Sequence, residues 1–177
     1  MEIFQLMADY NQWMNEKVYS SALKLNDNEL IQDRGAYFGS VLGTLNHILV
    51  GDIIWLKRFS GHAKTFSSLE YLRGRDLPGS LAETIHQDLA SLRSERSMVD
   101  EIIINFTREL TEQDSASLLT YSNMRGEYST KNLGFLVQHL FNHQTHHRGQ
   151  ISTLLSQFGL DIGVTDLLMC IPSAPRL

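Results

Sequence analysis

The sequence predicts an all-α protein that folds as a four-helix bundle, with residues 1–177 forming a single domain. The chain has only three prolines, so long stretches are free of the residue that breaks helices. Apolar residues also recur at three- and four-residue steps over four long segments. At a rise of about 1.5 Å per residue, each segment would be about 30 to 40 Å long, which suits the helices of a four-helix bundle.

The first two helices are predicted from apolar spacing and a capping residue. Ser40 offers an N-cap for the second helix, which we expect to end near Phe59. Val50 and Ile54 lie opposite the main apolar stripe of this helix, and a helix that is apolar on two sides needs two partners. We therefore expect a homodimer in which this face meets a second subunit. The first helix, residues 2–24, has the apolar stripe Ile3, Leu6, Met7, Tyr10, Trp13, Met14, Val18 and Ala22.

The middle of the chain predicts a connection followed by a third helix. Residues 60–79 lack clear periodicity and are expected to form a surface connection. Ser80 and Glu83 fit a capping box, and a helical stripe of apolar residues follows them. The third helix is therefore predicted over residues 81–107.

The last part of the chain predicts a hairpin, a long helix and a short tail element. Alternating residues over 118–130 resemble a short hairpin. The fourth helix is expected to start near Asn132 and to end before Gly159, a residue type suited to the end of a helix. A short element at residues 166–170 is expected to pack the tail onto the bundle.

Charge and cysteine content exclude several classes of protein. The net charge is −5, and no run of five or more Lys and Arg residues occurs, so we expect no nucleic-acid partner. Cys170 is the single cysteine, which indicates a reducing, cytoplasmic setting. The first residues lack the pattern of an export signal. The most apolar stretch, residues 48–56, contains Asp52 and is too short for a membrane span, so we expect no membrane partner either.

Histidines are concentrated in the predicted fourth helix. At about 100° per residue, His143 and His147 fall within about 20° of Leu136, which we take as the centre of the buried stripe. Two imidazoles four residues apart on one helical face can bind one cation. The alternative is a pair of core histidines that hydrogen-bond to backbone or water, and spacing alone leaves both interpretations open. His139 and His146 lie at the edge of the stripe.

A third metal ligand would have to come from another helix. His47 is the remaining histidine within a strongly apolar helix, and the small residues Gly43 and Gly51 would leave space around its ring. The alternative is that these glycines only allow close helix packing. His62 and His86 are expected in a loop and facing solvent, respectively.

Several other catalytic sites are excluded by the residues present. A zinc protease of the H-E-x-x-H type needs a carboxylate where this chain has Gln144, which cannot accept a proton as a base. A helical di-metal site needs Glu-x-x-His pairs, and the predicted fourth helix contains no Glu. No G-x-S-x-G motif occurs, and Cys170 lies in the tail, so neither a serine nor a cysteine hydrolase is indicated.

The sequence resembles the DinB family of small bacterial metal-binding bundles across almost its whole length. The strongest similarity is the string His139 to Gln150 (HLFNHQTHHRGQ), followed by LLSQFG at residues 154–159. YNQWMN at residues 10–15, LGTLNHIL at residues 42–49 and DLL at residues 166–168 add to it.

The resemblance implies a four-helix bundle, commonly dimeric, that binds one divalent metal ion through three histidines. By motif position these would be His47, His143 and His147. Relatives include thiol-dependent S-transferases and a maleylpyruvate isomerase that use low-molecular-weight thiols, so one hypothesis is a metal-dependent thiol S-transferase, or a hydrolase, that contains zinc or nickel. The alternative is a non-catalytic metal- or small-molecule-binding protein with a role in stress response, and a shared fold cannot choose between them.

Overall fold

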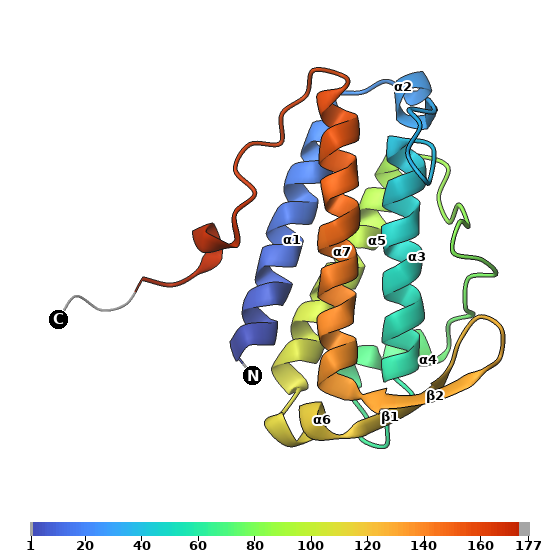
Figure 1. Ribbon diagram of the computed structural model, residues 1–177, viewed down its shortest axis with the longest axis vertical. Helices are drawn as coiled ribbons and strands as arrows, with labels where there is room; N and C mark the ends of the chain where they lie inside the picture. The colour runs from blue at the N-terminus through green and yellow to red at the C-terminus, as the bar shows by residue number, and fades with distance from the viewer. Residues whose placement is uncertain (1, 174–177) are drawn as a thin grey trace.

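Four long helices form the body of the molecule in the computed structural model, which describes residues 2–173. They are α1 (Glu2–Ala22), α3 (Val41–Phe59), α5 (Leu89–Glu109) and α7 (Leu133–Ser156) (Figure 1). Both α1 and α3 pack against α5 and α7, so the four helices lie side by side. This arrangement confirms the predicted all-α class. The shorter helices are α2 (Asp27–Ile31), η1 (Ser67–Leu69), α4 (Glu70–Arg73), α6 (Glu112–Ala116) and η2 (Leu167–Cys170).

Local signals place the ends of the helices that carry the histidines. The Ser40 hydroxyl accepts a hydrogen bond from the Gly43 amide at 3.0 Å and begins α3, as predicted. Asn132 caps α7 in the same way, accepting from the amide of Phe135 at 3.0 Å. The predicted hairpin is confirmed, with β1 (Leu118–Ser122) antiparallel to β2 (Tyr128–Asn132) immediately before α7.

The predicted start of the third long helix is wrong. Helix α5 begins at Leu89 with Asp88 as its N-cap, and the capping box of Ser80 and Glu83 does not form. The Asn46 side chain instead pairs with the backbone of His86, accepting from its amide and donating to its carbonyl, each at 3.0 Å. These contacts with α3 hold the preceding chain in an irregular path that a helix could not follow.

The connection at residues 60–79 lies only partly on the surface. It contains the short helices η1 and α4, and their apolar side chains enter the core. Phe66, Leu69 and Leu72 are fully buried. These helices span too few residues to give a clear helical period, which is why the sequence pattern does not reveal them.

The second apolar face of α3 is covered within a single chain. Val50 and Ile54 are 0% and 2% exposed, respectively. Residues 74–88 run alongside α3 (Figure 1), where the Asn46 side chain fastens them. The apolar pattern of α3 therefore has an explanation without a second subunit, and the homodimer stays a prediction.

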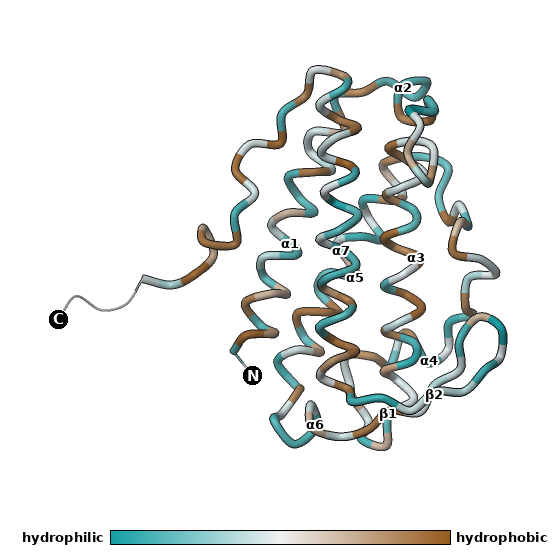
Figure 2. Tube along the Cα trace, viewed as in Figure 1, coloured by the Kyte–Doolittle hydropathy of each residue, from teal (hydrophilic) through white to brown (hydrophobic). Residues whose placement is uncertain are grey.

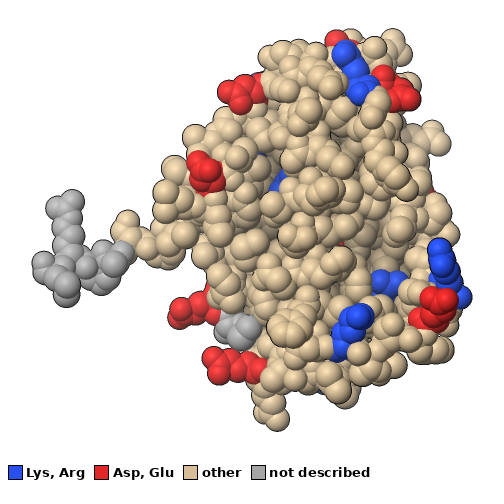
Figure 3. Space-filling model, viewed as in Figure 1, with Lys and Arg blue, Asp and Glu red and all other residues tan. Residues whose placement is uncertain are grey.

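The surface and tail complete the fold. Brown and teal segments alternate along the helices in Figure 2, as expected for helices with one buried side. On the face drawn in Figure 3, Lys and Arg side chains are scattered and form no continuous basic patch. The Tyr10 hydroxyl donates to the Thr165 carbonyl at 2.7 Å, and η2 contacts α1, so the predicted tail element does pack against the bundle. No described helix is both long and apolar enough to span a bilayer.

A buried polar network crosses the centre of the bundle and joins all four long helices. Asp52 on α3 forms an ion pair with Arg96 on α5, and Arg96 also pairs with Asp100 at 3.0 Å. The Gln144 amide on α7 donates to Asp52 at 2.8 Å and accepts from Arg148 at 3.0 Å. Asn11 and Asn15 connect α1 to the same groups. Since buried charges and amides are costly without partners, this network favours one relative placement of the helices.

Candidate metal centre

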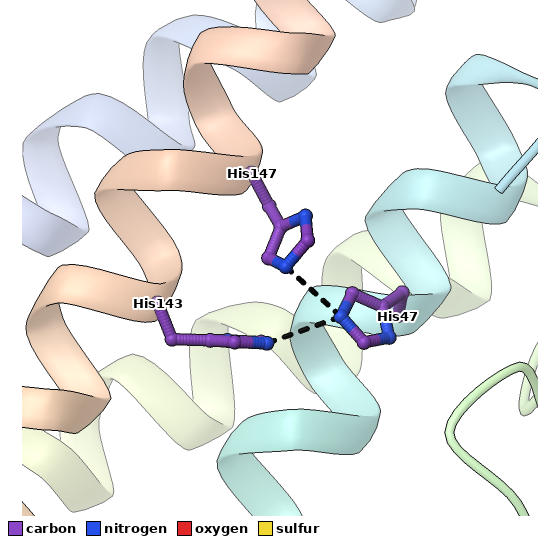
Figure 4. Close-up of side chains that lie close together, drawn as sticks. All are labelled: His47, His143 and His147. Carbon is purple, nitrogen blue, oxygen red and sulfur yellow. Dashed lines mark hydrogen bonds between the residues drawn. The ribbon is translucent and has the colours of Figure 1, made fainter. Parts of the chain in front are cut away.

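Three histidine side chains from two helices converge on one point. The Nε2 atom of His47 on α3 lies 3.1 Å from the Nε2 atoms of both His143 and His147 on α7 (Figure 4). All three possible ligand atoms lie within 4.8 Å of one another. The spacing of four residues along α7 places its two rings one above the other, facing α3.

Hydrogen bonds fix the tautomers of two of these rings. His47 Nδ1 lies 2.8 Å from the Leu81 carbonyl oxygen, and His147 Nδ1 lies 2.7 Å from the Oε1 atom of Gln150. Because both oxygens can only accept, each Nδ1 carries the proton and each Nε2 is left with a lone pair. Two such lone pairs 3.1 Å apart repel each other. A cation between the rings removes this repulsion, so the donor set fits a bound metal ion.

His143 is half-buried and packs closely against α3. Its ring lies against Gly51 on α3, where an added Cβ would be only 2.6 Å from Cε1. Burial, followed by the charge of the neighbouring histidines, lowers the pKa of His143 to about 3. Burial also lowers the pKa values of His47 and His147. All three rings therefore favour the neutral form that a metal ligand requires.

Phe38 covers one side of the centre, a contact that sequence reasoning missed. Its ring stacks on His47 with 3.6 Å between ring centres, and it meets the edge of His147 at 5.6 Å. Gly43 makes this possible, because a Cβ there would lie 2.2 Å from the Phe38 carbonyl oxygen. Gly39 has a φ of +73°, a conformation that favours glycine and turns the chain into α3. These glycines were the available signal for a loop folded closely over α3.

The predicted centre of the buried face of α7 is wrong. Gln144 and Arg148 are 0% and 3% exposed and lie at the middle of that face, while His143 and His147 lie at its edge and are half-buried. The sequence pattern treats polar residues as outward-facing, so it misplaces two residues that belong to the buried network. The edge position leaves the two rings facing both α3 and the open side of the bundle.

The other four histidines do not join the cluster. His139 and His146 are exposed neighbours on α7, with ring centres 6.3 Å from His143 and 4.8 Å from His147, respectively. His62 lies before η1 and its Nε2 is 2.8 Å from the Ser117 hydroxyl. His86 is predicted from the sequence to face solvent, but it is half-buried, and its Nε2 lies 2.5 Å from a Glu95 carboxylate oxygen.

A cavity of about 340 Å³ opens directly beside the histidines. His47 and His143 line its inner end, and Trp55, Arg58 and His139 continue the wall. Three protein ligands beside an open space resemble the arrangement of catalytic metal sites, which keep a position for water or substrate.

The chain is similar in sequence and in fold to known proteins. The chain is 29% identical over 162 residues to Protein DinB of Bacillus subtilis (strain 168), covering 90% of this chain and 88% of that protein. A crystal structure of a DinB-like protein from Bacillus cereus ATCC 10987 has a similar fold, with a TM-score of 0.62 at 21% identity, covering 93% of this chain and 96% of that one. The family model described as "DinB family" matches residues 1–176, and the chain therefore belongs to the DinB family.

Proposed function

We propose that the protein is a metal-dependent enzyme that transfers a low-molecular-weight thiol to a small electrophilic substrate, using one zinc or nickel ion held by His47, His143 and His147. The convergence of three Nε2 atoms beside an open cavity is the observation that carries this proposal. A divalent cation in such a site lowers the pKa of a thiol and thus favours the nucleophilic thiolate at neutral pH.

The residues of the chain would contribute orientation and shielding. Leu81 and Gln150 hold the rings of His47 and His147 in the tautomer that presents Nε2. Phe38 covers one side of His47 and keeps water from that side of the centre. The cavity provides room for the substrate on the remaining side. The proposed chemistry needs no cysteine in the site, and Cys170 lies on η2, which contacts α1.

Single alanine substitutions test the ligand assignment. We expect His47→Ala, His143→Ala and His147→Ala each to lose most bound zinc or nickel, because each removes one of three ligands. His139→Ala and His146→Ala are matched controls on α7, and they should lower metal affinity by about 10- to 100-fold or less, a smaller loss than removal of a ligand. Elemental analysis of untagged protein, expressed as metal per chain, measures the effect. Full occupancy in His47→Ala, or equal losses in His146→Ala and His147→Ala, would contradict the assignment.

Turnover tests the catalytic part of the proposal. The metal-loaded protein should accelerate the reaction of a small thiol, such as cysteine, with an alkyl halide, and a metal chelator should abolish the acceleration. The His146→Ala variant should keep this activity and His147→Ala should lose it. Stoichiometric metal binding without thiol-dependent turnover of any electrophile would instead indicate a non-catalytic metal-binding protein.

A further inference from the structure

The cavity beside the histidines has a positively charged outer wall. Arg58 on α3 and Arg125 at the hairpin turn both line it, although the chain as a whole has a net charge of −5. Arg125 is exposed, and the nearby Glu127 carboxylate is hydrogen-bonded to Asn123 at 2.8 Å rather than to an arginine. Within residues 2–173, neither arginine forms an ion pair.

Arg58 is held in position by contacts that leave its charge without an anionic partner. Its Nε atom donates to the Ser122 carbonyl at 3.1 Å. Its guanidinium lies 4.6 Å from the centre of the Trp55 ring and 5.0 Å from that of Tyr121. The terminal N–H groups donate to no group among residues 2–173, so the two terminal nitrogens remain available to donate to both oxygens of a carboxylate.

An aromatic path connects this charged end to the histidines. The His139 ring lies 5.0 Å from Trp55 and 6.3 Å from His143, measured between ring centres. Ile54 and Gly51 line the α3 side of the same cavity. The cavity is therefore cationic at one end, apolar and aromatic in the middle, and lined by ligand nitrogens at the other end.

We propose that this cavity selects organic carboxylates: the carboxylate pairs with the terminal N–H groups of Arg58, the apolar body lies against Trp55, and the far end of the ligand reaches His47 and His143. A planar, bidentate pairing favours a carboxylate on a single arginine fork. Arg125 adds attraction from the exposed turn. The inference deepens the proposed function, on which it rests for the chemistry at the histidine end, by assigning the class of substrate.

Binding of simple probes to the zinc-loaded protein tests this selectivity. Phenylacetate, its uncharged amide and phenyl phosphate would be titrated while the indole N–H signals of Trp55 and Trp13 are followed by NMR. We expect phenylacetate to shift the Trp55 signal and leave that of Trp13 unchanged, and to bind about 10-fold or more tightly than the amide, as charge-assisted hydrogen bonds imply. Equal affinity for acid and amide would overturn the proposal, as would tighter binding of phenyl phosphate than of phenylacetate.

Matched arginine variants identify the residue that recognises the anion. Arg58→Gln should weaken phenylacetate binding about 10-fold or more, and Arg58→Lys should also weaken it because the fork is lost. Arg125→Gln, at an exposed position in the turn, should weaken it about two- to five-fold. Arg108→Gln, an exposed position on α5 with the same charge change, should have no effect. Unchanged phenylacetate binding in Arg58→Gln would overturn the proposal.

Metal content of the same variants separates this inference from the proposed function. One zinc per chain in Arg58→Gln, together with weakened phenylacetate binding, supports the carboxylate site. If the unmodified chain binds zinc but does not distinguish acid from amide, the carboxylate inference fails and the metal centre stands. If the unmodified chain binds no metal, the proposed function fails, whatever the outcome with the probes.

Discussion

Gly51 sets the position of a ligand candidate by having no side chain. A Cβ at residue 51 would lie 2.6 Å from His143 Cε1 and 3.1 Å from its Nδ1, well inside normal contact distance. Backbone hydrogen bonds hold α3 in place, so the His143 ring is the group that would have to move. Small residues beside a metal site can therefore decide ligand geometry without contacting the metal.

We expect Gly51→Ala to lower zinc affinity about 10- to 100-fold, as for loss of other groups that orient metal ligands. Alanine favours a helix over glycine by about 1 kcal/mol, so the variant should remain folded. Gly149→Ala is the control, because no atom lies near its added Cβ and the residue is exposed on α7. Equal zinc affinities in the two variants, measured by competition with a chelator, would show that Gly51 does not position His143.

The segment between α4 and α5 closes one side of the candidate site although it has no regular structure. It supplies the Leu81 carbonyl that orients His47, and it depends on the Asn46 amide for its attachment to α3. The side-chain amide of Asn46 pairs with both the N–H and the C=O of His86, as a neighbouring strand does in a β-sheet. Loss of the Asn46 hydrogen bonds would therefore disturb the candidate metal centre by displacing the Leu81 carbonyl that orients His47.

At this element scale, Asn46→Ala should lower the free energy of unfolding by about 1 to 3 kcal/mol, because the part-buried backbone groups of His86 lose their partners. The amide of His86 should also exchange its hydrogen faster, which hydrogen–deuterium exchange detects. Asn28→Ala, at an exposed position on α2, is the matched control and should change stability by less than about 0.5 kcal/mol. Unchanged exchange at His86 in Asn46→Ala would contradict the proposed attachment.

The buried network acts on the scale of the whole molecule, because its members come from all four long helices. Gln144 links α7 to Asp52 on α3, one residue away along each helix from His143 and Gly51. The two helices that carry the histidines therefore meet at the histidine cluster and are also joined by the adjacent hydrogen bond between Gln144 and Asp52. Paired and hydrogen-bonded charges in a core specify the relative placement of the helices more strictly than apolar packing alone does.

Gln144→Leu keeps a similar volume but removes the link between α3 and α7. The free energy of unfolding should fall by about 1 to 3 kcal/mol, because Asp52 and Arg148 each lose a buried hydrogen bond. Urea unfolding at a fixed free zinc concentration measures the change. Gln138→Leu, at an exposed position on α7, should alter stability by less than about 0.5 kcal/mol. Equal stabilities of the two variants would indicate that the network contributes nothing at Gln144.

The oligomeric state is a separate prediction at the same scale. A homodimer would give about 40 kDa by light scattering, twice the chain mass of 20.2 kDa, as expected for a symmetric pair. Because the chain itself covers Val50 and Ile54, substitution on that face of α3 should not change the measured mass. A mass near that of one chain at micromolar concentration would show that the predicted homodimer is wrong.

The sequence by itself determines the elements that depend on nearby residues. Apolar spacing defines the long helices, and Ser40 and Asn132 mark where α3 and α7 begin, because an N-cap is a contact within one turn. The pairing of His143 with His147 follows from helical geometry alone. His47 could be predicted as the third ligand from its small neighbours and from family resemblance, and the structure brings its Nε2 to the other two.

Tertiary structure decides everything that depends on contacts between distant parts of the chain. Asn46 draws the backbone of His86 away from a helix that its local capping signal favours, and Phe38 reaches His47 only through a turned loop. Gln144 and Arg148 look like surface residues in the sequence, yet partners on other helices bury them. A hydrogen-bond partner on another helix changes the free-energy cost of burying a polar group, and a periodicity of apolar residues contains no information about such partners.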